Sequence, residues 1–254
     1  MEAGELAMRF FRRNPSAWAK EGGSLVTEAD IAVDDLLRTM LLAARPHYGW
    51  LSEETADDAA RQALTTIFVV DPIDGTRSFV AGEDFWCVSL AVVSGGRPVA
   101  AVLFAPARGE VYTASEGGGA RLGEERLSVS GRSELAGARL AGPRGWVRTD
   151  AVRESGAEVA AHIPSLAYRL TQVAAGRLDA AFASPRAHDW DLAASDLLVH
   201  EAGGRLTGLD GNPPLYNKAE PRHGVLAAAN SRLHPRLLAV VEAAGREVAR
   251  GRRA

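Results

Sequence analysis

The chain has 254 residues, 46% of them hydrophobic and 24% charged, as expected for a globular protein with a sizeable core. Its net charge of −3 provides no basic field, so neither nucleic acid nor an anionic membrane is an expected partner. The single cysteine, Cys87, excludes an intrachain disulfide, and its apolar neighbours indicate a buried, inert thiol. No segment approaches the roughly 18 apolar residues of a membrane span. Arginines interrupt the N-terminal apolar residues that a signal peptide would need, so we expect a cytoplasmic protein.

Two helices are predicted near the N-terminus. Apolar residues at helical spacing predict one helix over residues 2–13 and a second from Asp30 toward Pro46. Thr27 and Asp30 stand at the start of the second helix, where capping is the simplest interpretation of both side chains. The alternative interpretation places Asp30 in a functional site.

Acidic residues follow two short predicted strands. The segment Trp50 to Ser52 delivers Glu53 and Glu54, which would face opposite sides of a strand, so at most one would point into a site. A solvated acidic loop is the alternative. Residues 67–70 predict a buried strand that presents Asp71 at its carboxyl end, where open α/β sheets bind ligands.

The turn Asp71-Pro72-Ile73-Asp74-Gly75-Thr76 is the most informative segment. Its two aspartates stand three residues apart and can bridge hard cations, which prefer oxygen ligands. Gly75 allows a ligand to approach the backbone closely, and the amides of Gly75 and Thr76 would point at an anion if a helix begins there. The turn therefore predicts metal-assisted phosphate chemistry.

The remaining chain alternates between predicted strands and helices. We expect a hairpin over residues 85–104, a turn at residues 117–119, and strands at 110–114 and 127–130. A change of composition near residues 137–145 predicts a boundary between two subdomains, 1–138 and 139–254. Beyond this boundary, strands are expected at 139–141, 180–182, 205–207 and 224–228, and helices at 166–175, from 189 to Gly203-Gly204, and at 236–250.

Four segments together resemble the inositol monophosphatase superfamily of lithium-sensitive, magnesium-dependent phosphatases. They are residues 26–30 (VTEAD), 52–54 (SEE), 71–76 (DPIDGT), and 190–194 (WDLAA) with 201–204 (EAGG). The resemblance implies a layered αβαβα sandwich of α+β or α/β class, with a mixed-sheet N-terminal half and an α/β C-terminal half. It also implies a homodimer.

The same resemblance implies a magnesium site. One Mg²⁺ would be held by Glu53, Asp71 and the carbonyl of Ile73. A second would lie between Asp71, Asp74 and Asp191, and a weaker third would lie near Glu53. Asp74 and Asp191 would also border the bound substrate.

Catalytic roles follow from the resemblance as well. Thr76, hydrogen-bonded to Asp30, and Glu53 would orient and deprotonate an attacking water activated by the metal. The amides of Gly75 and Thr76 would hold the phosphate oxygens. Three neighbouring residues are left as structural: Glu54, Asp189 and Trp190.

The substrate is expected to be a small phosphorylated metabolite. Inositol-preferring members carry a glutamate shortly before the Trp-Asp pair, where this chain has residues 182–186 (FASPR). We therefore favour 3′-phosphoadenosine 5′-phosphate, with Arg169 reading its second phosphate and Ser184 lining the same wall. The alternatives are a surface role for Arg169, and inositol 1-phosphate or another sugar phosphate as the substrate.

Two other classes of protein were weighed. A haloacid-dehalogenase-type phosphatase also has an aspartate turn that ends in Gly-Thr, but with one residue between its aspartates, whereas Pro72 and Ile73 both intervene here. A catalytically inactive regulatory or binding protein on the same fold predicts the loss of a metal ligand. All four candidate carboxylates are present, which favours an enzyme.

Overall fold

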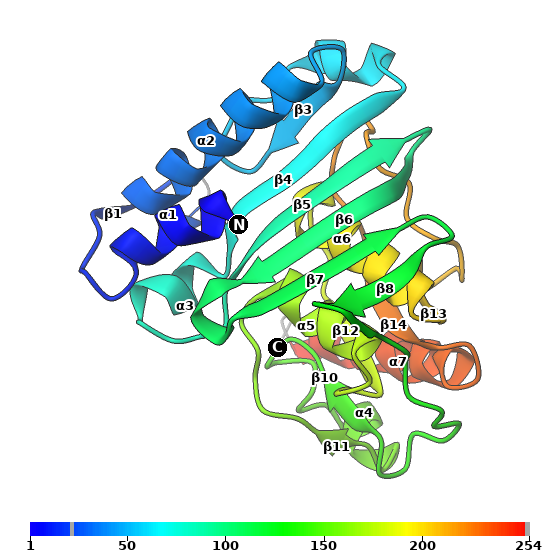
Figure 1. Cartoon of the computed structure of the whole chain (residues 1–254). Coiled ribbons are helices and arrows are strands. Elements are labelled where there is room, and N and C mark those ends of the chain that lie inside the picture. Colours follow the sequence, from blue (N-terminus) through cyan, green and yellow to red (C-terminus); the bar gives the residue numbers. More distant parts are fainter. Residues whose placement is uncertain (21–22, 252–254) are drawn as a thin grey trace.

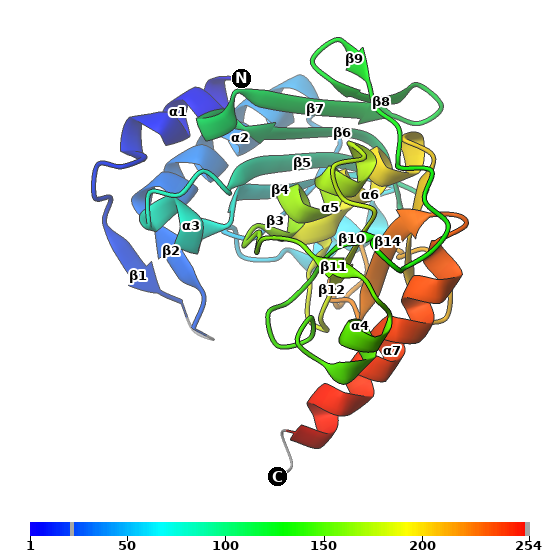
Figure 2. The same cartoon turned by 90° about the horizontal axis from the view of Figure 1, so that it is seen from below.

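The computed structural model describes residues 1–20 and 23–251, and these residues form five layers (Figures 1 and 2). Helices α1 (Glu2–Phe10) and α2 (Glu28–Ala44) cover the outer face of a seven-stranded sheet. Helices α5 (Leu166–Ala174) and α6 (Asp189–Glu201) lie between this sheet and a five-stranded sheet. Helices α4 (Asp150–Glu154) and α7 (His234–Gly251) cover the far side of the second sheet. The predicted αβαβα sandwich is confirmed.

The seven-stranded sheet is mixed. Its strand order follows the chain, and only β3 and β4 run parallel, while every later neighbour is antiparallel. Its members are β3 (Gly49–Ser52), β4 (Thr66–Asp74), β5 (Cys87–Ser94), β6 (Arg97–Ala105), β7 (Glu110–Ser115), β8 (Gly119–Leu122) and β9 (Glu125–Arg126). The apolar run of β4 is buried on both faces because helices cover both sides of the sheet.

The five-stranded sheet has the order β11-β10-β12-β14-β13. Strand β10 runs parallel to both β11 and β12, and β14 runs antiparallel to both β12 and β13. Their bounds are β10 (Arg139–Ala141), β11 (Glu158–Val159), β12 (Ala180–Ala183), β13 (Gly204–Gly208) and β14 (Leu226–Asn230). The predicted boundary at residues 138 and 139 stays a prediction; β10 begins at Arg139.

Helix α6 is buried along consecutive residues, not along one stripe. Residues 192–199 are all buried because the helix contacts the first sheet through β5 and β6 and the second through β13. A helix enclosed in this way needs apolar side chains on more than one face, which Leu192, Leu197, Leu198 and Val199 provide. The packing fixes the position of the first turn of α6, which carries Asp191.

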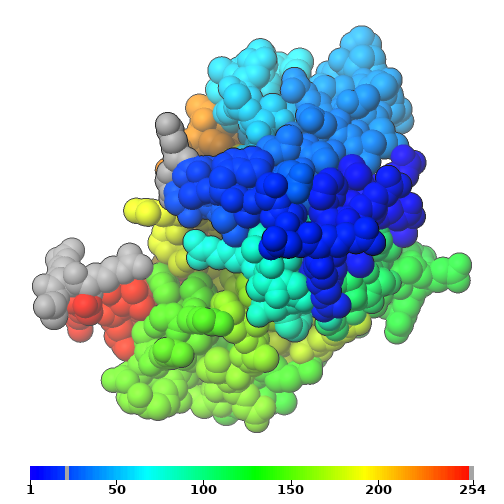
Figure 3. Space-filling model, turned by 90° about the vertical axis from the view of Figure 1, so that its left-hand side faces the viewer, coloured from blue at the N-terminus to red at the C-terminus, as the bar shows by residue number. Residues whose placement is uncertain are grey.

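Short elements complete the chain. The hairpin strands β1 (Ala17–Ala19) and β2 (Leu25–Thr27) precede α2, and the helix α3 (Thr76–Val80) follows β4. Two 3₁₀ helices are η1 (Ala59–Ala63) and η2 (Pro106–Arg108). Among the described residues, no helix is both long and apolar enough to cross a membrane. The N-terminal residues and α7 reach the surface in different regions of the molecule (Figure 3).

One predicted strand is wrong. Residues 127–130 alternate in sequence but form no strand, because their backbone bonds diverge to different partners. The amide of Leu127 donates to Ala120, whereas that of Val129 donates to Ala202 at the end of α6. The first predicted helix is also shorter than expected and ends at Phe10.

Candidate active site

The predicted turn is partly strand, because β4 continues through Asp74 and carries both aspartates at an irregular point of the sheet. Asp71 pairs with Ser89 and Asp74 with Cys87, so the register shifts between the two aspartates. Such irregularities redirect side chains beside many sites. Gly75 has φ +98°, and a Cβ there would lie 2.8 Å from the carbonyl oxygen of Phe85. The position therefore requires glycine.

Three carboxylates meet at the end of this turn. Glu53, Asp71 and Asp191 each offer one oxygen, and these oxygens lie within 4.8 Å of one another. The parallel pairing of β3 with β4 aligns Ser52 with Val70, which brings Glu53 beside Asp71. Asp191 comes from the first turn of α6, between the two sheets. The site therefore joins residues that are distant in sequence.

Burial and the neighbouring negative charges oppose the ionisation of Asp71 and Glu53. Burial, followed by the charge of Glu53, raises the pKa of Asp71 well above its usual value. Burial also raises the pKa of Glu53, against the effect of Lys20. A divalent cation would offset this repulsion, and carboxylate oxygens are the ligands that hard cations such as Mg²⁺ prefer. The donor set fits the predicted metal.

Asp74 lies beside the three clustered carboxylates but is held by different partners. Its Oδ2 accepts hydrogen bonds from the Ser165 hydroxyl at 2.5 Å and from the Ala167 amide at 2.6 Å. Burial, followed by the charge of Asp191, raises its pKa to about 7. Ser165 also caps α5 by accepting from the Tyr168 amide at 3.1 Å. Sequence reasoning missed Ser165, although Ser just before a predicted helix is a recognisable cap.

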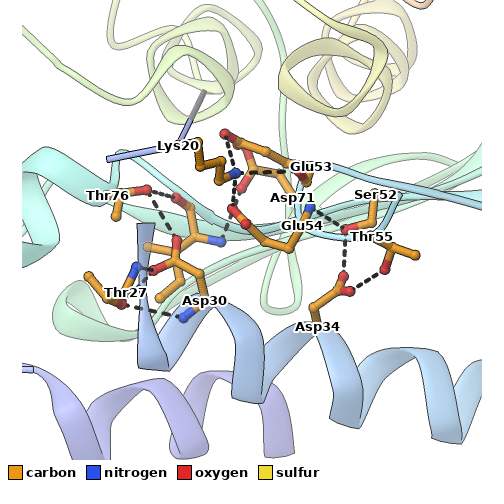
Figure 4. Close-up of polar contacts among 11 residues, drawn as sticks. Lys20, Thr27, Asp30, Asp34, Ser52, Glu53, Glu54, Thr55, Asp71 and Thr76 are labelled. Atoms are coloured by element: carbon orange, nitrogen blue, oxygen red, sulfur yellow. Dashed lines mark hydrogen bonds and ion pairs between the residues drawn. The ribbon is translucent and has the colours of Figure 1, made fainter. Parts of the chain in front are cut away.

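Asp30 caps α2, as the simplest interpretation predicts, and also contacts Thr76; its place in a functional site stays a prediction. Its Oδ2 accepts from the Thr27 amide at 2.8 Å and from the Thr27 hydroxyl at 2.5 Å, which completes the cap of α2. Its Oδ1 accepts from the Thr76 hydroxyl at 3.1 Å (Figure 4). The same hydroxyl lies 3.1 Å from the carbonyl oxygen of Ile73. The cap therefore fixes a carboxylate directly behind Thr76.

The two glutamates after β3 turn toward the same cation. The Lys20 ammonium lies 3.3 Å from Glu53 Oε1 and 2.6 Å from Glu54 Oε1 (Figure 4). The expectation that the glutamates face opposite sides is wrong, because β3 ends at Ser52 and the alternation stops there. Burial raises the pKa of Glu54 to about 7. No local pattern pointed to Lys20.

A buried aspartate on α2 anchors the loop that carries Glu53. Asp34 accepts hydrogen bonds from the hydroxyls of Ser52 and Thr55, each at 2.5 Å (Figure 4). These bonds tie both ends of the loop to α2. The loop therefore holds Glu53 in place without regular secondary structure.

The predicted substrate-side residues line a cavity of ≈300 Å³. Arg169 and Ser184 share this cavity with Asp74 and Asp191. Arg169 is only 5% exposed, so its interpretation as a surface arginine is wrong. One of its terminal nitrogens donates to the carbonyl of Ile163 at 2.8 Å, while its Nε is buried without a hydrogen-bond partner among the described residues. Burial lowers its pKa to about 10.

A buried network braces the start of α6 from outside the cluster. Asp189 accepts from the Asn217 amide at 2.8 Å and lies 2.7 Å from the His223 imidazole. The Asn217 side chain in turn accepts a hydrogen bond from Arg61 at 2.8 Å. Arg61 lies in η1 and also donates to Asp57, which precedes η1 in the chain. The network therefore links the region after Glu53 to the helix that carries Asp191.

A layered αβαβα fold that gathers carboxylates between its sheets is the arrangement of a metal-dependent phosphatase. The model of the inositol monophosphatase family matches residues 1–246. This chain belongs to that family.

Several known proteins are similar over nearly the whole chain. The inositol-1-monophosphatase of Mesorhizobium japonicum is 34% identical over an alignment of 254 positions, which covers 95% of this chain and 92% of that protein. The histidinol-phosphatase of Mycobacterium tuberculosis is 38% identical over 230 residues, which cover 84% and 83%. The crystal structure of the extragenic suppressor protein suhB from Bartonella henselae is 31% identical with a TM-score of 0.83, and 95% of this chain and 94% of that one are covered. The family is one of phosphatases. The first two relatives are also phosphatases, but their names give different substrates, inositol 1-phosphate and histidinol phosphate.

Proposed function

We propose that this protein is a magnesium-dependent phosphomonoesterase that hydrolyses a small phosphorylated metabolite with an activated water. The observation that carries the proposal is the meeting of Glu53, Asp71 and Asp191 beside a threonine hydroxyl backed by Asp30. One buried and two half-buried carboxylates at this separation repel one another, so the site is suited to divalent cations. The open cavity next to them has room for a small phosphoester.

The proposed metal ligands are those that the resemblance implies. Glu53, Asp71 and the carbonyl of Ile73 would hold one Mg²⁺, Asp74 and Asp191 would complete a second site with Asp71, and a weaker third would lie near Glu53. When bound, Mg²⁺ supplies Lewis-acid chemistry, which lowers the pKa of a water and neutralises charge on the phosphoryl group. A second metal site of this type is also the basis for expecting inhibition by lithium.

The protein's own residues would orient the water and the phosphate. Asp30 accepts from the Thr76 hydroxyl, which leaves the oxygen of Thr76 free to accept a hydrogen bond from the water. Glu53, whose pKa burial raises, is suited to receive its proton. The amides of Gly75 and Thr76 at the start of α3 would donate to phosphate oxygens.

Two substrates are proposed. 3′-Phosphoadenosine 5′-phosphate is supported by Arg169, whose buried guanidinium lines the cavity beside Asp74 and has an unpartnered Nε among the described residues. Inositol 1-phosphate is the second candidate, supported by the named activity of the Mesorhizobium japonicum relative. On the family resemblance alone, we further propose a homodimer located in the cytoplasm.

The test is phosphate release from a panel of phosphoesters by the purified protein, in Mg²⁺ and in chelator. The panel comprises 3′-phosphoadenosine 5′-phosphate, inositol 1-phosphate, fructose 1,6-bisphosphate and histidinol phosphate. We expect Mg²⁺-dependent release from at least one compound and inhibition by lithium at about millimolar concentration. Release from none of them would favour a catalytically inactive regulatory protein on the same fold. An Arg169→Ala variant should lose activity toward the bisphosphates alone if Arg169 reads a second phosphate.

A further inference from the structure

A second cavity opens at the same edge of the five-stranded sheet as the active-site cavity. It has a volume of ≈350 Å³ and is lined by Arg144, Arg148 and His162, with Val147 and Val159 as apolar wall. The parallel strands β10, β11 and β12 end at residues 141, 159 and 183, so both cavities lie beyond the carboxyl ends of these strands. Ligands of open α/β sheets bind at this edge.

The two cavities share a short wall. Pro164 lines the first cavity and His162 the second, and two residues span at most about 7 Å of extended chain. Arg169 reaches into this wall, because it donates to the carbonyl of Ile163 at 2.8 Å. Burial and then the positive charges of Arg144 and Arg169 lower the pKa of His162, against the effect of Glu83, so these cations lie close together. The two cavities are therefore neighbours along this edge of the sheet.

The second cavity carries positive charge that the described residues leave unpaired. In residues 1–20 and 23–251, neither Arg144 nor Arg148 has a carboxylate partner within ion-pair distance, whereas Arg153 on α4 pairs with Asp150 at 2.7 Å. Guanidinium groups bind carboxylate and phosphate oxygens through paired N–H donors. Free arginines beside an apolar wall therefore suit an anionic group attached to a carbon skeleton.

We propose that Arg144 and Arg148 bind a second anionic group of the substrate, a phosphate or a carboxylate, while its scissile phosphate lies at the carboxylate cluster. This inference rests on the proposed phosphatase activity and specifies its substrate class, a phosphomonoester with a distal oxyanion. Val147 and Val159 contact the skeleton between the two groups. Compounds with one phosphate and no other anion bind without these arginines.

The test compares matched substrates that differ only in the distal group. 2,5-Anhydromannitol 1,6-bisphosphate is compared with 2,5-anhydromannitol 1-phosphate, and 6-phosphogluconate with glucitol 6-phosphate, so that phosphate and carboxylate are tested separately. The double variant Arg144→Ala/Arg148→Ala is measured beside wild type, and Arg153→Ala serves as the control because it removes an exposed arginine from the neighbouring helix.

We expect wild type to prefer the member of a pair that has the distal anion. The double variant should raise the KM of that member roughly tenfold or more, with kcat and the KM of the matched partner little changed, because only binding of the distal group is lost. The Arg153→Ala control should leave kcat and KM unchanged for all four substrates. Equal KM values within both pairs in wild type, or no change in the double variant, would overturn this inference alone. Release of phosphate from none of the compounds with Mg²⁺ would overturn the proposed function with it.

Discussion

Replacing Asp74 with asparagine should stabilise the metal-free protein while abolishing its Mg²⁺-dependent phosphate release. The carboxylate lies between two fixed donors, Ser165 and Ala167, and the negative charge of Asp191. In the variant, the amide oxygen can keep both donors, and the amide nitrogen can donate toward Asp191. The substitution thus removes a buried charge without removing its hydrogen bonds.

The magnitude follows from the pKa of Asp74. This pKa is about 7 in the folded protein and 3.8 for a free side chain. Each unit of difference between the two pKa values corresponds to about 1.4 kcal/mol of unfolding free energy. Because the pKa of Asp74 is higher in the folded protein than in the unfolded chain, its ionisation does not lower stability below pH 3.8. The loss of stability grows as the pH rises from 3.8 and is complete once the pH passes 7. Asp74→Asn should therefore gain about 4 kcal/mol of metal-free stability above pH 7, or roughly 10 °C in Tm.

The assay is thermal unfolding of wild type and Asp74→Asn in chelator and in Mg²⁺, at several pH values between 4 and 8. In chelator, the variant should unfold at nearly the wild-type temperature at acid pH and progressively above it toward pH 8. In Mg²⁺, the variant should gain less stability than wild type, because it keeps only the site of Glu53, Asp71 and Ile73, and only wild type should release phosphate. A variant less stable than wild type in chelator at pH 8, or a difference that does not change with pH, would refute the reasoning.

Three further predictions concern residues around the cluster. Thr76→Val should lower kcat about 10²-fold or more, because it removes the hydroxyl that Asp30 orients. The variant should retain the Mg²⁺-dependent rise in Tm, and a near-normal kcat would exclude the proposed role of Thr76. Arg61→Ala should cost about 2 kcal/mol of unfolding free energy, because it removes a buried side chain and leaves the side-chain oxygen of Asn217 without its donor. It should also raise the Mg²⁺ concentration needed for half-maximal stabilisation, and an unchanged Mg²⁺ titration would separate this network from the site. Phosphate release by wild type should fall in millimolar lithium, and complete resistance would count against the second metal site.

The elements that carry the carboxylates were predictable because local rules determine them. The apolar run of β4 ends at Asp71, and the cap of α2 includes Asp30, so both patterns could be recognised in short windows of sequence. Spacing alone favoured the cap for Asp30 and a solvated loop for Glu53. Only the family resemblance placed these two residues together at one site.

The supporting contacts were not predictable because they join remote segments. Ser165 lies 91 residues from Asp74, and Arg61 lies 156 residues from Asn217. No periodicity in either segment encodes such a pairing. The common direction of Glu53 and Glu54 was missed for a local reason, since β3 ends at Ser52, before both glutamates, and strand alternation does not apply to them.

If Glu53, Asp71 and Asp191 hold the magnesium ions needed to hydrolyse phosphomonoesters, phosphate release should require both Mg²⁺ and these carboxylates. The most direct measurement is phosphate release from inositol 1-phosphate and 3′-phosphoadenosine 5′-phosphate by wild type and Asp191→Asn, each with Mg²⁺ and with chelator. We predict release by wild type in Mg²⁺ alone, and none by the variant, which should still unfold cooperatively. Release by wild type in chelator, or near-normal release by Asp191→Asn, would contradict the claim.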